Sequence, residues 1–310
     1  MANLNVNRIY VLLASLCMMA WTGCASQQHS ETTPADSSSE SSGGEVTIST
    51  QEDADQHYRN AIELKRQGNL NKALHQVERA IAIKSNFAAA HYLRGDILRS
   101  MMRYEDAVLA YREARTLQTD YQDAYSMEGG LLVRTARYEE AIDVLKQAVI
   151  LDSHDTRSYV HLGLAYRKLG RLDEAAHAYR EGLRVAPGNA DLHNNLAVTL
   201  RKQDKPEESL EAYRRAIKYR PEEYQFHLNL AVALRSMDRF EKAIPHYKQA
   251  LKLQPKHPGA LFDLGVCYAQ TGKFSLAKKH FNDYIAVAEA NNPKGVEKAK
   301  EMLKSIDGKS

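Results

Sequence analysis

From residue 54 to residue 291, small and apolar residues return at the same places in every stretch of 34 residues. Within a stretch they are three, four or seven positions apart, which places them on one face of an α-helix. The pattern predicts two helices per stretch. The clearest marker is a small residue repeated without insertion or deletion: Ala73, Ala107, Ala141, Ala175, Ser209, Ala243 and Ala277. The seven predicted units are 54–87, 88–121, 122–155, 156–189, 190–223, 224–257 and 258–291.

Positions within a unit are numbered here from its first residue. Small residues at positions 8, 20 and 27 allow two helix backbones to approach closely, and bulky residues at positions 11, 17, 24 and 30 fill the remaining space. Position 8 is occupied by Ala61, Gly95, Gly129, Gly163, Ala197, Ala231 and Gly265. Position 24 is occupied by Val77, Tyr111, Leu145, Tyr179, Tyr213, Tyr247 and Phe281.

This pattern resembles the tetratricopeptide repeat (TPR), and residues 162–189 are close to the family consensus. The resemblance covers 54–291 and implies an all-α fold, in which fourteen antiparallel helices stack into a right-handed superhelix. After Asn292, an apolar helical stripe predicts a C-terminal capping helix and tail within 292–310. The stripe consists of Val296, Ala299, Met302, Leu303 and Ile306.

A few residues depart from this pattern. At position 7, where the later units have Leu, the second and third units have Arg94 and Glu128. These two side chains either pair across the stack or extend separately into solvent from a loosened N-terminal end. Pro245 falls inside a predicted helix and is expected to kink it. Pro206 lies at a predicted helix start, where proline is well tolerated.

Residues 1–24 have the character of an export signal, because Arg8 precedes an apolar run that is too short to span a bilayer permanently. Thr22, Gly23 and Cys24 resemble a bacterial lipobox, in which the cysteine is lipidated and becomes the new N-terminus. Trp21 departs from the Leu usual in that motif. The resemblance implies a lipid anchor at Cys24 and an outer-membrane address; the alternative is an ordinary signal cleaved after Ala25.

Residues 25–53 are rich in Ser and Thr and contain six acidic residues but no Lys or Arg. A segment of this composition buries too little apolar surface to fold, so we expect a disordered tether. The whole chain carries 42 basic and 39 acidic residues, and all but Arg8 and those six acids belong to residues 54–310. The repeat region therefore has a net charge of +8, which the total of +3 conceals.

In the TPR family, the first helix of each unit lines a concave groove through positions 2, 5, 6, 9, 12 and 13. Here these positions hold three kinds of side chain: apolar residues, asparagines, and Lys or Arg at positions 12 and 13, called the basic ladder below. An asparagine amide can bond both an N–H and a C=O of an extended peptide. The candidate partner-binding residues are Asn194, Asn195, Leu228, Asn229, Val232, Phe262, Arg167, Lys168, Arg201, Lys202 and Arg235.

Each of these features also has a purely structural interpretation. The basic residues lie near helix C-termini, where cations favour the helix dipole in any protein. The apolar residues could pack against neighbouring helices rather than against a ligand. The Lys and Asn pair of the family's two-carboxylate clamp is missing at positions 5 and 9, which disfavours a co-chaperone role.

No catalytic motif, phosphate-binding loop or metal-ligand spacing is present, so neither an enzyme nor a cofactor is expected. His57, His91, His193 and His227 all occupy position 4 of their units, where they replace the packing aromatic of the consensus. Equivalent residues of successive units are too far apart to share one metal ion. Cys267 is expected to be a buried small hydrophobe.

These features favour a non-catalytic, periplasm-facing adaptor that binds a protein segment, does not bind nucleic acid, and assists the assembly of an envelope machine. A lipid anchor followed by a TPR array resembles the lipoproteins that pilot type IV pilus secretins and those that scaffold peptidoglycan hydrolases. The alternative is an envelope protein that binds polyanions through its basic surface; polyanion binding falls steeply with salt, whereas binding in an apolar groove does not.

Overall fold

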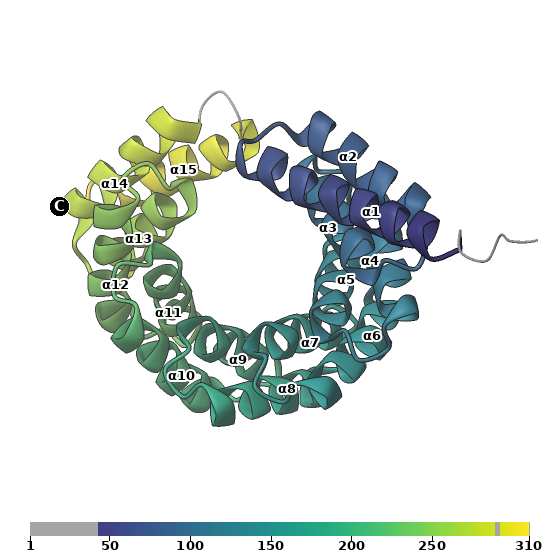
Figure 1. The fold of residues 1–310 in the computed structure, drawn as a ribbon. Coiled ribbons are helices and arrows are strands. Elements are labelled where there is room, and N and C mark those ends of the chain that lie inside the picture. Colours follow the sequence, from purple (N-terminus) through teal and green to yellow (C-terminus); the bar gives the residue numbers. More distant parts are fainter. Residues whose placement is uncertain (1–42, 289–291, 310) are drawn as a thin grey trace, which may run out of the picture. The chain divides into compact units, whose positions relative to one another are not determined.

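The computed structural model describes residues 43–288 and 292–309, which form fifteen α-helices and no strand. Residues 45–310 form one compact unit. The odd-numbered helices line the inside of the ring in Figure 1, and the even-numbered helices of the pairs lie outside them. The first helices of the pairs are α1 (Gly43–Arg66), α3 (Ala88–Ser100), α5 (Gln122–Arg134), α7 (Thr156–Lys168), α9 (Ala190–Lys202), α11 (Tyr224–Ser236) and α13 (Pro258–Gln270). The second helices are α2 (Leu70–Ile83), α4 (Tyr104–Leu117), α6 (Tyr138–Leu151), α8 (Leu172–Val185), α10 (Pro206–Tyr219), α12 (Phe240–Leu253) and α14 (Phe274–Ala288), and α15 (Pro293–Ile306) follows.

The seven predicted helical pairs are confirmed, but the first helix begins earlier than expected. Helix α1 starts at Gly43, so the prediction of a disordered tether is wrong for residues 43–53. No Pro or Gly interrupts the chain between Glu45 and Gln67, so nothing in the backbone stops the helix before the glycine pair at 43–44. The rest of the tether, the export signal and Cys24 lie outside the described residues.

The two helices of a unit approach each other where a small residue at position 8 faces a bulky residue at position 24. A Cβ atom on Gly95 would lie 2.7 Å from the Tyr111 ring, and a Cβ atom on Gly265 would lie 2.9 Å from the Phe281 ring. Both distances are shorter than a carbon–carbon contact allows. The position-24 residues Tyr111, Tyr179, Tyr213, Tyr247 and Phe281 are among the largest fully buried side chains of the chain.

Three of the position-4 histidines are buried, and each makes a specific bond. The Nε2 atoms of His91, His193 and His227 lie 2.8–2.9 Å from the backbone oxygens of Ser85, Pro187 and Pro221, respectively. Each bond joins the start of a first helix to the loop just before it. The prediction that these histidines serve packing is confirmed, and the hydrogen bond to the loop is an additional finding.

Glu128 has partners other than the one considered from the sequence. Its side chain is completely buried, and its oxygens accept hydrogen bonds from Arg112, at 2.9 Å, and from Arg115 of α4. Both alternatives left open by the sequence are therefore wrong for Glu128: it pairs with two arginines of α4 rather than with Arg94, and it is buried rather than extended into solvent. The Nε atom of Arg94 is buried without a hydrogen-bond partner.

The C-terminal helix α15 continues the 34-residue phase, and the predicted cap is confirmed. Ala299 lies 34 positions after Gly265 and is fully buried, as expected for position 8 of an eighth unit. Lys298 stands at position 7, where the four preceding units have a buried Leu. Helix α15 is therefore a first helix whose outer side is adapted to water. Pro206 starts α10 as predicted, and α12 continues through Pro245.

Position 15 of every unit, in the turn between paired helices, has a left-handed backbone. Gly68, Gly170 and Gly272 adopt this conformation, but the other four units place a non-glycine residue there: Met102, Ala136, Asp204 and Asp238, with φ values of 55–61°. Left-handed backbone costs an L-residue about 1–2 kcal/mol, and glycine avoids most of this cost. The first and fourth units therefore have less strained turns than the second and third.

We expect Ala136→Gly to stabilise the fold by about 0.5 kcal/mol, because relief of the left-handed strain outweighs the added freedom of the unfolded chain. Gly170→Ala is the matched control and should destabilise by about 1 kcal/mol, since a Cβ there meets no neighbour and only the backbone matters. Urea denaturation followed by circular dichroism measures both changes. Equal shifts of the two variants in one direction would contradict this interpretation.

We expect Glu128→Ala to destabilise by about 3 kcal/mol, because it leaves two arginines and a cavity at a buried ion pair. Glu128→Leu should cost clearly less, since Leu fills the site as it does in the later units and the partly exposed arginines keep access to water. The same denaturation experiment ranks the variants. If Leu is as harmful as Ala, the ion pair itself rather than the filled volume stabilises this position.

Candidate functional site

The odd-numbered helices form an inner wall, and half-buried apolar side chains line part of it. These side chains are called the apolar floor below. Positions 4, 7, 8 and 11 of these helices face the even-numbered helices and are mostly buried, so positions 5 and 9 lie toward the inside of the ring. In the C-terminal half of the solenoid, these positions pack partly against the core and keep an accessible side: Val160, Leu164, Val198, Val232, Phe262 and Val266. The wall can therefore contact a ligand through apolar surface.

Two of the predicted asparagines are connected across neighbouring helices. The Nδ2 atom of Asn229 on α11 donates to Oδ1 of Asn194 on α9 at 2.9 Å, and Gln225 donates to Oδ1 of Asn229 at 3.0 Å. Asn195, one position further along α9, is half-buried and makes no side-chain hydrogen bond within the described residues. Asn195 is thus the asparagine best placed to bond a peptide backbone.

Two predicted groove residues have different surroundings from those expected. Leu228 is only 8% exposed and belongs to the core, so its assignment to the groove surface is wrong. Phe262 is half-buried between Phe281 and Tyr284, and the amino group of Lys298 on α15 lies 5.6 Å from its ring centre. The cap therefore limits access to Phe262.

The basic ladder of position 12 is neutralised at both ends of the solenoid. Near the N-terminus, Lys65 lies 2.5 Å from Asp96, and Arg99 lies 3.6 Å from the same carboxylate. Near the C-terminus, Arg235 lies 3.5 Å from Asp263. Arg167, Lys168, Arg201 and Lys202, in the middle, form no ion pair with a carboxylate among the described residues. Arg134 on α5 also has no carboxylate partner among these residues and lies 4.5 Å from the ring centre of Tyr104. Two adjacent unpaired cations on one helix occur on α7 and on α9.

Buried tyrosines of position 24 donate hydrogen bonds to the two aspartates that form the ion pairs at the ends of the ladder. The hydroxyl of Tyr111 donates to Asp96 at 2.7 Å, and that of Tyr247 donates to Asp263 at 3.1 Å.

Burial raises the pKa of two groups on α13. The pKa of Asp263 is raised by burial, with Arg235 opposing the shift, and the pKa of the Cys267 thiol is raised to about 12. Cys267 is fully buried, as the sequence predicted. A protonated, inaccessible thiol is not a nucleophile.

The sequence itself contains a signal that some residues of the basic ladder have a structural role. Arg occurs at position 12 in the four units that have Tyr at position 24 and is missing where that position holds Val77, Leu145 or Phe281. The pairing indicates that these arginines pack near a tyrosine hydroxyl of their own unit. Position 13 shows no such relation, so Lys168 and Lys202 have no structural partner to explain them.

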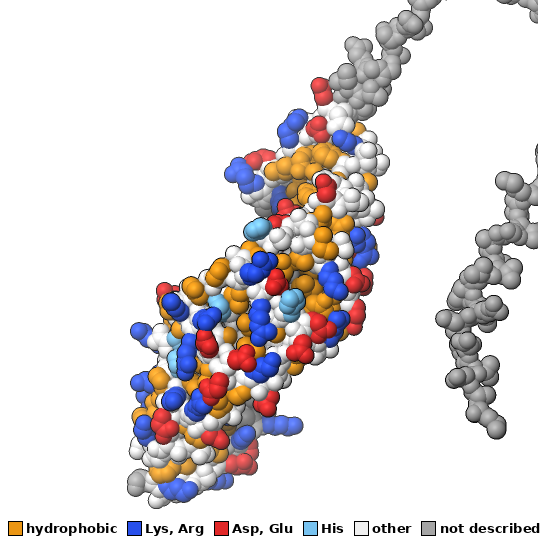
Figure 2. Space-filling model, turned by 90° about the horizontal axis from the view of Figure 1, so that it is seen from below, with side chains coloured by type: hydrophobic (Ala, Val, Ile, Leu, Met, Phe, Trp, Pro, Cys, Tyr) orange, Lys and Arg blue, Asp and Glu red, His pale blue; other side chains and the backbone are white. Residues whose placement is uncertain are grey.

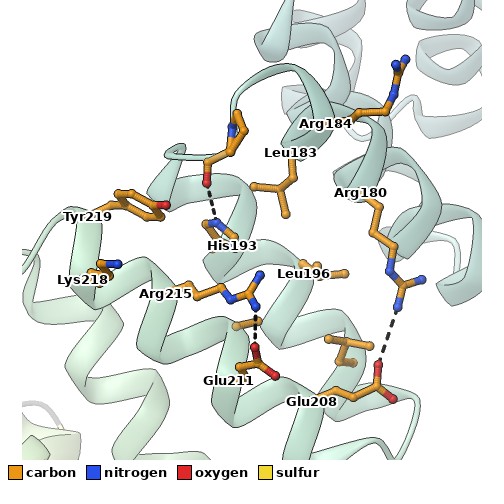
Figure 3. A pocket seen from close by; sticks show the side chains of 13 residues that line it. Arg180, Leu183, Arg184, His193, Leu196, Glu208, Glu211, Arg215, Lys218 and Tyr219 are labelled. Carbon is orange, nitrogen blue, oxygen red and sulfur yellow. Dashed lines mark hydrogen bonds and ion pairs between the residues drawn. The ribbon is translucent and has the colours of Figure 1, made fainter.

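A second surface feature lies on the outside and was not predicted. A cavity of about 670 Å³ opens between α8 and α10, with α9 as its floor (Figure 3). Leu183, Leu196 and Leu200 supply apolar lining, and the ring of His193 stacks on Tyr219 at 5.6 Å. Position 23 is Ala212 here, whereas the sixth unit has His246 stacked on His227 at the equivalent place.

The charges at the rim of this outer cavity are largely paired. Arg180 lies 3.8 Å from Glu208, and Arg215 lies 2.5 Å from Glu211 (Figure 3). The face that contains α8 and α10 shows basic and acidic side chains interspersed rather than one field of a single sign (Figure 2). The outer surface there is therefore less suited to a polyanion than the net charge of +8 suggested.

No group of three side chains that could hold a metal ion occurs among the residues whose placement is described. Within the same residues, no helix has both the length and the apolar character needed to cross a membrane.

Comparison with known proteins identifies the repeat. Models of the tetratricopeptide-repeat family match residues 58–237, in overlapping segments, and 222–290, so the chain belongs to this family. A search of curated proteins gave no match.

The solved structures to which the chain is similar are TPR proteins. YrrB, described as a TPR protein with an unusual peptide-binding site, is 26% identical and has a TM-score of 0.53; the match covers 63% of this chain and 96% of YrrB. A TPR protein from Parabacteroides merdae is 16% identical with a TM-score of 0.61, covering 82% and 98%. PilF of Pseudomonas aeruginosa is 19% identical with a TM-score of 0.58, covering 72% and 99%. The last two similarities show the fold alone. The chain therefore has the all-α TPR fold of protein-interaction scaffolds.

Proposed function

We propose that this protein is a non-catalytic scaffold that binds a segment of a partner protein along the inner wall of α7, α9, α11 and α13. The observation that carries the proposal is the continuous floor of half-buried apolar side chains on these helices. Such side chains remain partly in water in the free chain, and a ligand would remove them from water at about 25 cal/mol per Å². The peptide-binding site named for YrrB supports the same use of the fold.

The polar groups of the wall suit an extended segment, whose backbone N–H and C=O groups are not bonded to each other. Asn195 has an uncommitted amide, and one primary amide can donate to a peptide carbonyl while accepting from a peptide N–H. Apolar contacts supply affinity and the amide fixes the register, which is the usual division of roles in a binding groove. We infer that residues Asn195, Val198 and Val232 form the centre of the contact.

The test is a capture experiment from envelope extract with the wild type and the variant Val198→Glu/Val232→Glu. Two acids in the floor place charge where the partner's apolar side chains would lie, so the variant should lose at least 90% of the captured partner, on the order of 1.4 kcal/mol or more. Leu228 is avoided, because a charge at that buried position would unfold the helix pair.

The matched control is Leu109→Glu/Ile150→Glu. These side chains lie on even-numbered helices and are 54% and 71% exposed, so the control adds the same charge outside the groove. It should retain the partner, and both variants should keep the wild-type circular dichroism spectrum. Equal capture by the groove variant and the wild type would show that the inner wall is not the binding site.

We further propose that Cys24 is lipidated, that the scaffold faces the periplasm from the outer membrane, and that it assists assembly of an envelope machine. The support is the sequence Thr22-Gly23-Cys24 after an apolar run. A lipid at this cysteine and the acidic stretch after it would hold the repeat domain near the membrane. Stable anchoring requires more than one acyl chain, which diacylation and N-acylation together provide.

Replacement of Cys24 by Ala tests the anchor. The wild type should fractionate with outer membranes and incorporate labelled palmitate, whereas the variant should be released to the soluble fraction or remain uncleaved. An unlabelled wild type that is processed after Ala25 would identify an ordinary export signal instead.

A further inference from the structure

Four cations at the C-terminal ends of α7 and α9 form one uncompensated basic site, here named the central cation quartet: Arg167, Lys168, Arg201 and Lys202. Lys168, Arg201 and Lys202 are exposed, and Arg167 is half-buried. The two helices are neighbours on the inner wall (Figure 1). The site therefore presents two pairs of positive charges that face the inside of the ring.

The contrast with the two ends of the ladder shows that this arrangement is specific to the middle. Asp96 forms ion pairs with Lys65 and Arg99, and Asp263 forms one with Arg235. Helices α7 and α9 have no acidic residue at positions 5, 6, 9, 12 or 13. No carboxylate of the described residues forms an ion pair with the quartet, although Asp173 lies near its edge, where it accepts a hydrogen bond from Gln203 at 2.7 Å.

Two cations of the quartet also lie near tyrosine hydroxyl groups of their own units. Arg167 and Arg201 oppose the rise that burial causes in the pKa of Tyr179 and Tyr213, respectively. These two arginines therefore contribute to the packing of their units, but neither forms an ion pair with a carboxylate among the described residues.

The side chains of these cations are not needed to bond the last carbonyl groups of α7 and α9. The last carbonyl groups of α7 accept hydrogen bonds from the backbone N–H groups of Leu169, Gly170 and Arg171. Those of α9 accept from Gln203, Asp204 and Lys205 in the same way. The helix dipole favours positive charge there, but the side chains are free to bond a ligand.

We propose that the quartet binds an extended acidic segment of the partner, with carboxylates three residues apart; this inference rests on the proposed function. Packed helices lie about 8–10 Å apart. A polyproline II segment advances about 3.1 Å per residue with three residues per turn, so residues i and i+3 lie on one side about 9 Å apart. One carboxylate would meet the pair on α7 and the next would meet the pair on α9.

The apolar floor beside the quartet fits the residues between the two acids. Leu164 and Val198 are half-buried one turn before the cations on α7 and α9. A segment that places acids on the quartet can rest its small or apolar residues on these side chains. The chemistry assigned to the ligand is therefore acidic, extended and partly apolar.

The test measures binding of a fluorescein-labelled peptide of four Glu-Pro-Ala triplets to the purified full chain by anisotropy in low salt. Its control peptide has Gln in place of Glu. We expect the acidic peptide to bind at least tenfold more tightly than the Gln peptide. The variant Arg167→Gln/Lys168→Gln/Arg201→Gln/Lys202→Gln should lose at least tenfold in affinity for the acidic peptide.

The matched control is Arg180→Gln/Arg184→Gln/Arg215→Gln/Lys218→Gln, which removes four cations from the rim of the outer cavity. It should change the affinity less than twofold. Equal losses in both variants would mean non-specific attraction and overturn the proposal, as would equal binding of the two peptides. Circular dichroism verifies that each variant is folded.

Two further outcomes separate this inference from its alternatives. If the quartet variant captures the envelope partner normally while Val198→Glu/Val232→Glu loses it, the acidic ligand is wrong and the groove function stands. If the peptide binds only after residues 25–42 are deleted, the quartet holds the chain's own acids Glu31, Asp36 and Glu40, which overturns the assignment to a separate partner. The deletion spares the compact unit of residues 45–310, so the repeat domain stays intact.

Discussion

The close approach of two helices within each unit is the contact on which the whole molecule depends. A small residue at position 8 lies against a large buried one at position 24, as Gly95 lies against Tyr111 and Gly265 against Phe281. Because this contact sets the spacing within a pair, it also sets how the next pair stacks and how the inner wall curves. The same large side chains carry hydroxyl groups in four units, and Tyr111 and Tyr247 use them to bond Asp96 and Asp263. Packing and the charge pattern of the wall are therefore coupled.

That coupling divides the wall into regions with different chemistry. Both ends of the basic ladder are bonded to acids of the chain itself, and their polar groups stabilise the stack. The centre combines unpaired cations on α7 and α9 with an apolar floor and a free asparagine amide. Ion pairs within the chain account for the charges at the ends, whereas the ligand proposed above would account for the unpaired charges at the centre. The net charge of the repeat domain is thus less informative than its distribution.

The sequence was sufficient for the fold because the 34-residue period is set by contacts inside each unit, which recur at fixed spacing. The sequence was a poorer guide to contacts between side chains of different units. Leu228 was expected on the groove surface and is buried, and Glu128 bonds Arg112 and Arg115 rather than Arg94. The start of α1 at Gly43 was missed, because a polar composition does not by itself stop a helix that lacks Pro and Gly. The outer cavity was also missed, since side chains of three helices, α8, α9 and α10, line it together.

Helix α15 has a consequence for how such a chain can change in length. It keeps the phase of a first helix, with Ala299 buried at position 8, and differs from its predecessors mainly by charges such as Lys298. The end of the array is thus encoded by a few polar substitutions on an otherwise regular unit. Duplication of an internal 34-residue block would insert a pair ahead of α15 and lengthen the inner wall without a new terminus. The number of ligand contacts can then evolve by recombination, while each added pair inherits an interface that already fits.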